Sequence, residues 1–124
     1  MVPGNINIGE AELEIMKVLW QAKEPVNTQY INEAVEKRGW KRTTISTFLT
    51  RLIQKEAVLS EKRGKSYYYS PLISQKDYRK WQTKNLITNL YNGSVKDFAL
   101  SLFEEEKLSD KDIKELRAIF DRED

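Results

Sequence analysis

The 124-residue sequence contains no cysteine and no histidine. These residue types supply most metal ligands, thiol nucleophiles and acid–base groups that titrate near neutral pH. Their absence argues against disulfides, a typical zinc site and Ser-His-Asp catalysis, so we expect no metal, no cofactor and no enzymatic activity. No run approaches the roughly 18 consecutive apolar residues of a membrane-spanning helix, and residues 1–5 do not resemble an export signal. We therefore expect a cytoplasmic protein that does not insert into membranes.

Charge is unevenly distributed along the chain, although its net value is only +2. Residues 1–84 hold 15 Lys and Arg against nine Asp and Glu, whereas residues 85–124 hold six against ten. A basic first part and an acidic second part suggest two different tasks. Differences of this size also arise by chance on solvated surfaces, so the asymmetry alone is weak support for an anionic partner.

Two helices are expected in the first forty residues. Apolar residues recur along two sides of residues 10–22, which predicts a helix that is covered on both sides and therefore central. Pro25 interrupts this pattern. Asn27 then offers an N-cap for a short second helix, with Val26 and Ile31 as a hydrophobic staple, and Gly39 is suited to end it.

Residues 43–54 are the most informative segment. Its apolar residues follow helical spacing: Ile45, Phe48, Leu49, Leu52 and Ile53. The opposite face holds Thr43, Ser46, Thr47, Thr50 and Gln54. Threonine is a mediocre helix former, so helix stability does not account for this face. Short hydroxyl side chains can approach phosphates and base edges closely, and a threonine methyl packs well on the methyl of thymine.

A change from helical to strand periodicity follows over residues 58–69. Two short strands around a turn with Gly64 predict a β-hairpin with a basic tip. Three helices and a basic hairpin are the element order of a winged helix-turn-helix, whose third helix enters the major groove. The expected DNA-binding residues are Lys41, Arg42, Thr43, Thr44, Ser46, Thr47, Thr50, Arg51, Lys62, Arg63 and Lys65. Arg51 has the alternative role of an intramolecular ion-pair partner.

Three helix starts of one kind occur after residue 72. Ser74, Ser94 and Ser109 are each followed three residues later by Asp, which is a capping pattern. The helices that they open carry apolar faces too wide for about fifty residues to bury alone. These faces either fold back on the N-terminal unit or pack against a second copy, and we favour a homodimer. The expected dimerisation residues are Leu86, Leu90, Tyr91, Val95, Phe98, Leu102, Phe103, Ile113, Leu116 and Phe120.

The expected fold is thus mainly α with a small β-hairpin wing. A winged helix-turn-helix DNA-binding domain covers residues 1–72, and a three-helix dimerisation domain covers residues 73–124. In a two-fold dimer, two recognition helices would meet half-sites about 34 Å apart on a double-stranded, dyad operator.

Several separated motifs resemble the penicillinase repressors of the BlaI/MecI type. They are Ala11–Met16 with Trp20, Trp40 with Thr44–Ile45, Thr47 and Thr50–Leu52, Tyr67–Tyr69, and Asn89–Gly93 with Leu108–Ser109. The resemblance spans residues 8–121. It implies a homodimeric transcriptional repressor of β-lactam resistance genes that binds a dyad operator. It also implies release when a membrane sensor-protease triggers cleavage inside the dimerisation region.

Some features depart from the family pattern. Lys41-Arg42 stands where the family often has Ser-Pro, which adds positive charge at the third helix. The bond cleaved in the family is typically Asn-Phe, and the aligned pair here is Ser101-Leu102. Either the cleavage site is kept with different chemistry or induction follows another route. Copper-responsive relatives carry a C-terminal cysteine cluster, which this sequence lacks, so copper sensing is disfavoured.

Other functions fit the same fold. A winged-helix module that binds a protein partner would have little use for a threonine face beside a basic tip. A repressor that responds to a small molecule would share the DNA contacts but would release DNA without proteolysis. An enzyme is the poorest interpretation, because carboxylates such as Asp110 and Asp112 lie at an expected helix start, where they satisfy helix amides.

Overall fold

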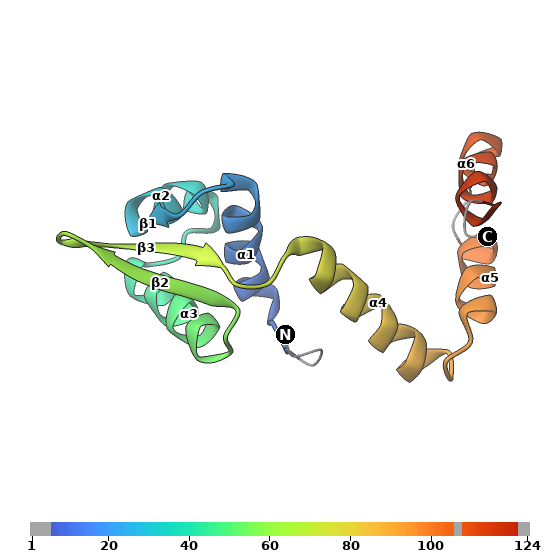
Figure 1. Ribbon diagram of the computed structural model, residues 1–124, viewed down its shortest axis with the longest axis horizontal. Helices are drawn as coiled ribbons and strands as arrows, with labels where there is room; N and C mark the ends of the chain where they lie inside the picture. The colour runs from blue at the N-terminus through green and yellow to red at the C-terminus, as the bar shows by residue number, and fades with distance from the viewer. Residues whose placement is uncertain (1–5, 106–107, 122–124) are drawn as a thin grey trace. The chain divides into compact units, whose positions relative to one another are not determined.

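The computed structural model describes residues 6–105 and 108–121, without the side chains of residues 103–105 and 119–121. Its elements follow the expected order of three helices, a hairpin and three helices (Figure 1). They are α1 (Glu10–Ala22), β1 (Val26–Asn27), α2 (Thr28–Ala34), the 3₁₀ turn η1 (Glu36–Arg38), α3 (Arg42–Gln54), β2 (Val58–Arg63), β3 (Ser66–Pro71), α4 (Gln75–Leu90), α5 (Val95–Glu105) and α6 (Asp110–Asp121). The chain divides into two compact units, residues 1–81 and residues 82–124. The functional boundary expected at residue 72 stays a prediction.

α1 is the central helix of the first unit, as its two apolar sides predict. It packs against α2, α3 and β3. Ile15, Met16 and Leu19 are almost completely buried in the core. The Glu12 side chain closes the first turn of the helix by accepting a hydrogen bond from the Gly9 N–H at 2.9 Å.

Asn27 caps α2 as the sequence predicts. Its side-chain oxygen accepts a hydrogen bond from the Tyr30 N–H at 2.9 Å, and Val26 and Ile31 are both buried. α2 ends at Ala34, and η1 then leads the chain to Gly39, which has a φ of +71°. The helical stretch therefore ends at the expected glycine, but its last turn is a 3₁₀ turn.

The sheet contains one strand more than the sequence predicts. β2 and β3 form the expected antiparallel hairpin, which we call the wing, with a two-residue loop of Gly64 and Lys65. A φ of +63° at Gly64 fits a type II′ turn. β1 pairs with the other edge of β3, so the strand order is β1-β3-β2. Figure 1 shows the wing extending beyond α1, α2 and α3.

The core of the first unit continues past the wing into α4. Trp20 donates a hydrogen bond from Nε1 to the Ile73 carbonyl at 2.9 Å. Its ring lies 5.7 Å from the Tyr78 ring, and both Ile73 and Tyr78 are buried. Trp81 also packs against this core. The first turns of α4 thus belong to the winged-helix unit.

The three capping patterns after residue 72 are confirmed. The hydroxyls of Ser74, Ser94 and Ser109 accept hydrogen bonds from the backbone N–H groups of Asp77, Asp97 and Asp112 at 3.0, 3.0 and 3.1 Å. α4 ends where Gly93, with a φ of +81°, donates to the Ile87 carbonyl. Within residues 6–105 and 108–121, no helix combines the length and apolar character needed to cross a membrane.

Candidate nucleic-acid interface

α3 buries one face and exposes the opposite face. Ile45, Leu49 and Leu52 are at most 2% exposed. The residues that we call the hydroxyl face, Thr43, Ser46, Thr47 and Thr50, are all exposed, and Thr44 is half-buried. Ile53, the last residue of the predicted apolar stripe, is 37% exposed, because about 100° per residue places it about 80° around the helix from Ile45. The structure therefore presents the predicted hydroxyl face to solvent.

Two threonines of the hydroxyl face are hydrogen-bonded to the helix itself. Thr47 Oγ1 donates to the Thr43 carbonyl at 3.0 Å, and Thr50 Oγ1 donates to the Ser46 carbonyl at 2.9 Å. A hydroxyl has one proton, so both donors are already used. Each oxygen keeps its acceptor capacity, and each side chain keeps its methyl group.

Three cations surround the hydroxyl face. Lys41, Arg42 and Arg51 are exposed and form no ion pair within the part of the chain that the structure describes. The alternative role of Arg51 as an ion-pair partner is therefore not seen among those residues. Unpaired, exposed guanidinium and ammonium groups are suited to phosphate contacts.

A partly buried ion pair connects α1 to the far end of α3. Lys55 Nζ lies 2.5 Å from Glu12 Oε1, and the two side chains are 35% and 6% exposed. Burial raises the pKa of Glu12, but its hydrogen bonds with Lys55 and the Gly9 N–H and the charges of Lys55 and Arg51 outweigh burial and lower the pKa below its ordinary value. Sequence reasoning missed this pair, although a glutamate at the third helical position is the acidic half of a capping box.

The three cations at the wing tip do not share one face. Directly opposite residues of antiparallel strands lie on the same face, and faces alternate along each strand. Lys62 pairs with Tyr67 and lies on the face of Val58, which is buried in the core. We call this side the core-side face of the wing, because Val58 belongs to the core that also includes Ile45, Leu49 and Leu52 of α3.

Arg63 lies on the opposite, outer face of the wing. Its Nε is 2.8 Å from Glu61 Oε1, and its guanidinium carbon is 4.9 Å from the centre of the Tyr68 ring. The hydrogen bond with Glu61 raises the pKa of Arg63. Lys65 occupies the loop and, like Lys62, forms no ion pair within the described residues. Lys62 and Lys65 are thus freer for phosphate than Arg63.

A hollow of about 270 Å³ lies between the start of α2 and the wing tip. Every side chain in its lining has a hydrogen-bond donor and none is acidic: Asn27, Thr28, Gln29, Lys65, Ser66 and Tyr67. The pairing of β1 with β3 brings these residues together. We call this 270 Å³ hollow the donor-lined hollow. Sequence reasoning missed Thr28, Gln29 and Tyr67 as candidate contacts, since β1 was not expected.

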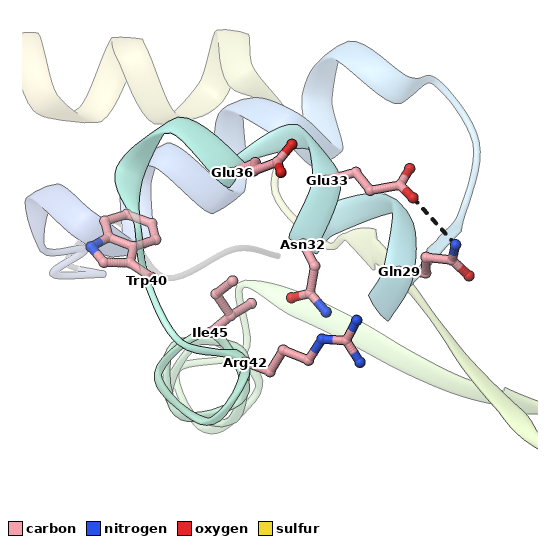
Figure 2. A pocket seen from close by; sticks show the side chains of 7 residues that line it. All are labelled: Gln29, Asn32, Glu33, Glu36, Trp40, Arg42 and Ile45. Carbon is pink, nitrogen blue, oxygen red and sulfur yellow. Dashed lines mark hydrogen bonds between the residues drawn. The ribbon is translucent and has the colours of Figure 1, made fainter.

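A second hollow, of about 260 Å³, lies between α2 and the start of α3 (Figure 2). Its lining is Gln29, Asn32, Glu33, Glu36, Trp40, Arg42 and Ile45. Figure 2 shows the Arg42 side chain extending from α3 toward Asn32 of α2. Glu33 accepts a hydrogen bond from Gln29, and the Trp40 ring packs edge-on against Phe48. With two carboxylates, this hollow suits an anion less well than the donor-lined hollow does.

The second unit exposes much of the apolar surface that the sequence predicts for dimerisation. Leu86, Leu90, Val95, Leu102 and Leu116 are 39, 72, 59, 36 and 37% exposed. Tyr91, Phe98 and Ile113 are half-buried, with the Tyr91 and Phe98 rings 5.5 Å apart. The side chains of Phe103 and Phe120 lie outside the described residues. The dimerisation role of all these residues stays a prediction.

The candidate cleavage pair lies within α5. Ser101 accepts a hydrogen bond from the Tyr91 hydroxyl at 3.1 Å and donates one to the Phe98 carbonyl at 2.6 Å. Leu102 is among the exposed apolar residues of this helix. Cleavage at this bond stays a prediction.

Comparisons with known proteins agree with this architecture. The penicillinase repressor family matches residues 8–122. The penicillinase repressor of Bacillus licheniformis is 34% identical over 114 residues, which cover 92% of this chain and 89% of that protein. The methicillin resistance regulatory protein MecI of Staphylococcus aureus is 32% identical over 115 residues, which cover 93% of this chain and 94% of that protein.

Two solved structures are similar to the chain. One is the DNA-binding domain of the repressor BlaI, with a TM-score of 0.53 and 39% identity, covering 63% of this chain and 94% of that one. The other is monomeric Bacillus licheniformis BlaI in complex with the blaP half-operator, with a TM-score of 0.51 and 38% identity, covering 63% and 92%. The winged-helix fold predicted from the sequence is confirmed. The chain belongs to the penicillinase repressor family.

Proposed function

We propose that this chain is a DNA-binding transcriptional repressor of resistance genes, and that it contacts its operator through α3 and the wing. The exposed hydroxyl face of α3, with unpaired cations around it, carries this proposal. The relatives support it, because they are named a penicillinase repressor and a methicillin resistance regulatory protein, and one similar structure was solved with a half-operator. A protein-binding winged helix would not need this combination of hydroxyls and cations.

The contacts divide into two kinds. Phosphates would be bound by Lys41, Arg42 and Arg51 around α3, and by Lys62 and Lys65 on the wing. Base edges would be read by Thr43, Thr44, Ser46, Thr47 and Thr50. The donor-lined hollow adds Thr28, Gln29 and Tyr67 as phosphate contacts, because its lining offers donors and no carboxylate. Arg63 contributes less, since its charge is already paired with Glu61.

Two copies would assemble through the apolar residues of the second unit. Leu90 and Val95 are among its most exposed large apolar side chains, and a second copy would remove them from water. Joining two half-site modules raises affinity by roughly 10² to 10⁴ when both engage. Cleavage at Ser101-Leu102, after the action of a membrane sensor-protease, would separate the two modules and remove this gain in affinity. The operator would then be released without a small molecule binding in a pocket of the repressor.

The test is a fluorescence anisotropy titration at several salt concentrations. The full chain is titrated against a duplex from the region upstream of its own gene and against a scrambled duplex of equal length. We expect preference for the upstream duplex, with a steep salt dependence. Thr47→Ala should weaken binding to the upstream duplex more than binding to the scrambled one, whereas Lys62→Ala should weaken both about equally. Equal losses from both variants would contradict the assignment of base readout to α3.

A further inference from the structure

The hydroxyl face of α3 contains two chemically different pairs of residues. The hydroxyl protons of Thr47 and Thr50 are donated to the carbonyls of Thr43 and Ser46. The side chains of Thr43 and Ser46 form no hydrogen bond within the described residues. Thr43 and Ser46 can therefore still donate to a base or a phosphate, whereas Thr47 and Thr50 cannot donate without breaking a bond to their own helix.

The hydrogen bonds also determine which part of the Thr47 and Thr50 side chains a base can contact. Both oxygens lie about 3 Å from a carbonyl of the preceding helical turn, so they are occupied on the helix side. A base donor that approached either oxygen would have to come beside that carbonyl. The γ-methyl is the other substituent on the same β-carbon, and a β-branched side chain with a fixed hydroxyl holds its methyl in one position. Thr47 and Thr50 thus present an ordered apolar group.

We infer that Thr47 and Thr50 read thymine through its 5-methyl group, by apolar contact and not by hydrogen bonding. In the major groove only thymine presents a methyl group. The hydroxyl of these residues then serves to hold the methyl in place, which explains why threonine occupies exposed positions where better helix formers exist. This inference rests on the proposed function, because it concerns bases that α3 would contact.

The test compares thymine with uracil in the same duplex. A single half-site is first obtained by selecting bound duplexes from a random pool with the full chain. It is then synthesised with deoxyuridine at each thymine in turn, which removes only the 5-methyl group from the major groove. At one or two positions we expect the unmodified chain to lose about fourfold in affinity per methyl, the equivalent of about 0.8 kcal/mol per buried methylene.

Matched variants separate the methyl from the hydroxyl. Thr47→Val keeps a methyl and removes the hydroxyl, so it should still bind the thymine duplex more tightly than the uracil duplex. Thr47→Ser keeps the hydroxyl and removes the methyl, so it should bind both duplexes equally at that position. Thr50→Val and Thr50→Ser form the equivalent pair. Thermal unfolding followed by tryptophan fluorescence shows whether each variant keeps its fold.

The outcomes that overturn the inference are distinct from failure of the proposed function. Equal binding of thymine and uracil duplexes by the unmodified chain refutes methyl readout while leaving specific DNA binding intact. Loss of thymine preference in both valine variants, with retention in both serine variants, assigns readout to the oxygen instead. If selection enriches no sequence over the random pool, the proposed function itself fails and the inference fails with it.

Discussion

The ion pair between Glu12 and Lys55 predicts how firmly α3 is held against α1. Replacing Glu12 with alanine removes two interactions: the hydrogen bond from the Gly9 N–H and the one from Lys55 Nζ. A capping interaction contributes about 1 kcal/mol, and a hydrogen bond to a charged group about 1.5–3 kcal/mol. Lys55 is 35% exposed and can be rehydrated, so the lower part of this range applies. We expect Glu12→Ala to lower the free energy of unfolding by about 2–3 kcal/mol.

Tryptophan fluorescence is a suitable measurement, because Trp20, Trp40 and Trp81 all lie in residues 1–81. The expected loss corresponds to a decrease of about 10–20 °C in the midpoint of thermal unfolding for a unit of this size. Lys55→Ala should cost about 1–2 kcal/mol, since Glu12 keeps its bond to Gly9. The double variant should then show a coupling energy of about 1–2 kcal/mol.

Glu14→Ala is the matched control on the same helix. Glu14 also forms ion pairs, with Arg38 and with Lys17 at 3.1 Å, but it is 25% exposed, against 6% for Glu12, and its two partners are about half exposed. Exposed pairs contribute little, so this variant should unfold near the temperature of the unmodified chain. A coupling energy between Glu12 and Lys55 below about 0.5 kcal/mol, or an equal effect of Glu14→Ala, would refute the reasoning.

Further predictions concern pH, the wing and the second unit. The pKa of Glu12 is lowered in the folded state, so its charge contributes stability that is fully present above pH 4.5, the ordinary pKa, and is lost as the pH falls through the pKa of the folded state. Urea unfolding at several pH values should show this loss, and the free energy of unfolding of Glu12→Gln should depend less on pH over this range. Gly64→Ala should lower the free energy of unfolding by about 1 kcal/mol, because φ is +63°. No clash adds to this cost, since no atom lies within 4 Å of an added Cβ, and an unchanged midpoint of thermal unfolding would contradict the prediction. Lys62→Ala should reduce the salt dependence of operator binding by about one phosphate contact and Arg63→Ala by less, and the reverse order would show that the wing faces are misassigned. Leu90→Lys should shift sedimentation toward monomer without changing tryptophan-reported unfolding, and an unchanged sedimentation coefficient would remove Leu90 from the interface.

Features that depend on neighbouring residues could be predicted from the sequence. Each of the caps at Ser74, Ser94 and Ser109 needs only a serine and the backbone N–H of the Asp three residues later, so the spacing of these residues is enough to predict it. The exposed hydroxyl face of α3 follows from helical periodicity alone. For the same reason, the element order of a winged helix is visible before any tertiary contact is known.

Features that depend on residues distant in sequence could not be predicted. Strand β1 has two residues, too few to show alternation, and it exists only because β3 offers an edge. The partner of Glu12 is 43 residues away. Some local features could not be predicted either: the hydroxyl rotamers of Thr47 and Thr50 and the pairing of Arg63 with Glu61 are each one choice among several nearby partners, and the sequence does not determine that choice.

The two faces of the wing limit how its length can change during evolution. A single residue inserted into β2 before Glu61 would exchange the two faces between that point and the loop, so that Glu61 would stand on the core-side face where Lys62 now stands. Loss or gain of one residue on each of the two strands, next to the loop, would leave every other residue paired as now and on the same face of the wing. Lengths of related wings should therefore differ in even steps, and an odd difference should be accompanied by a β-bulge that restores the faces.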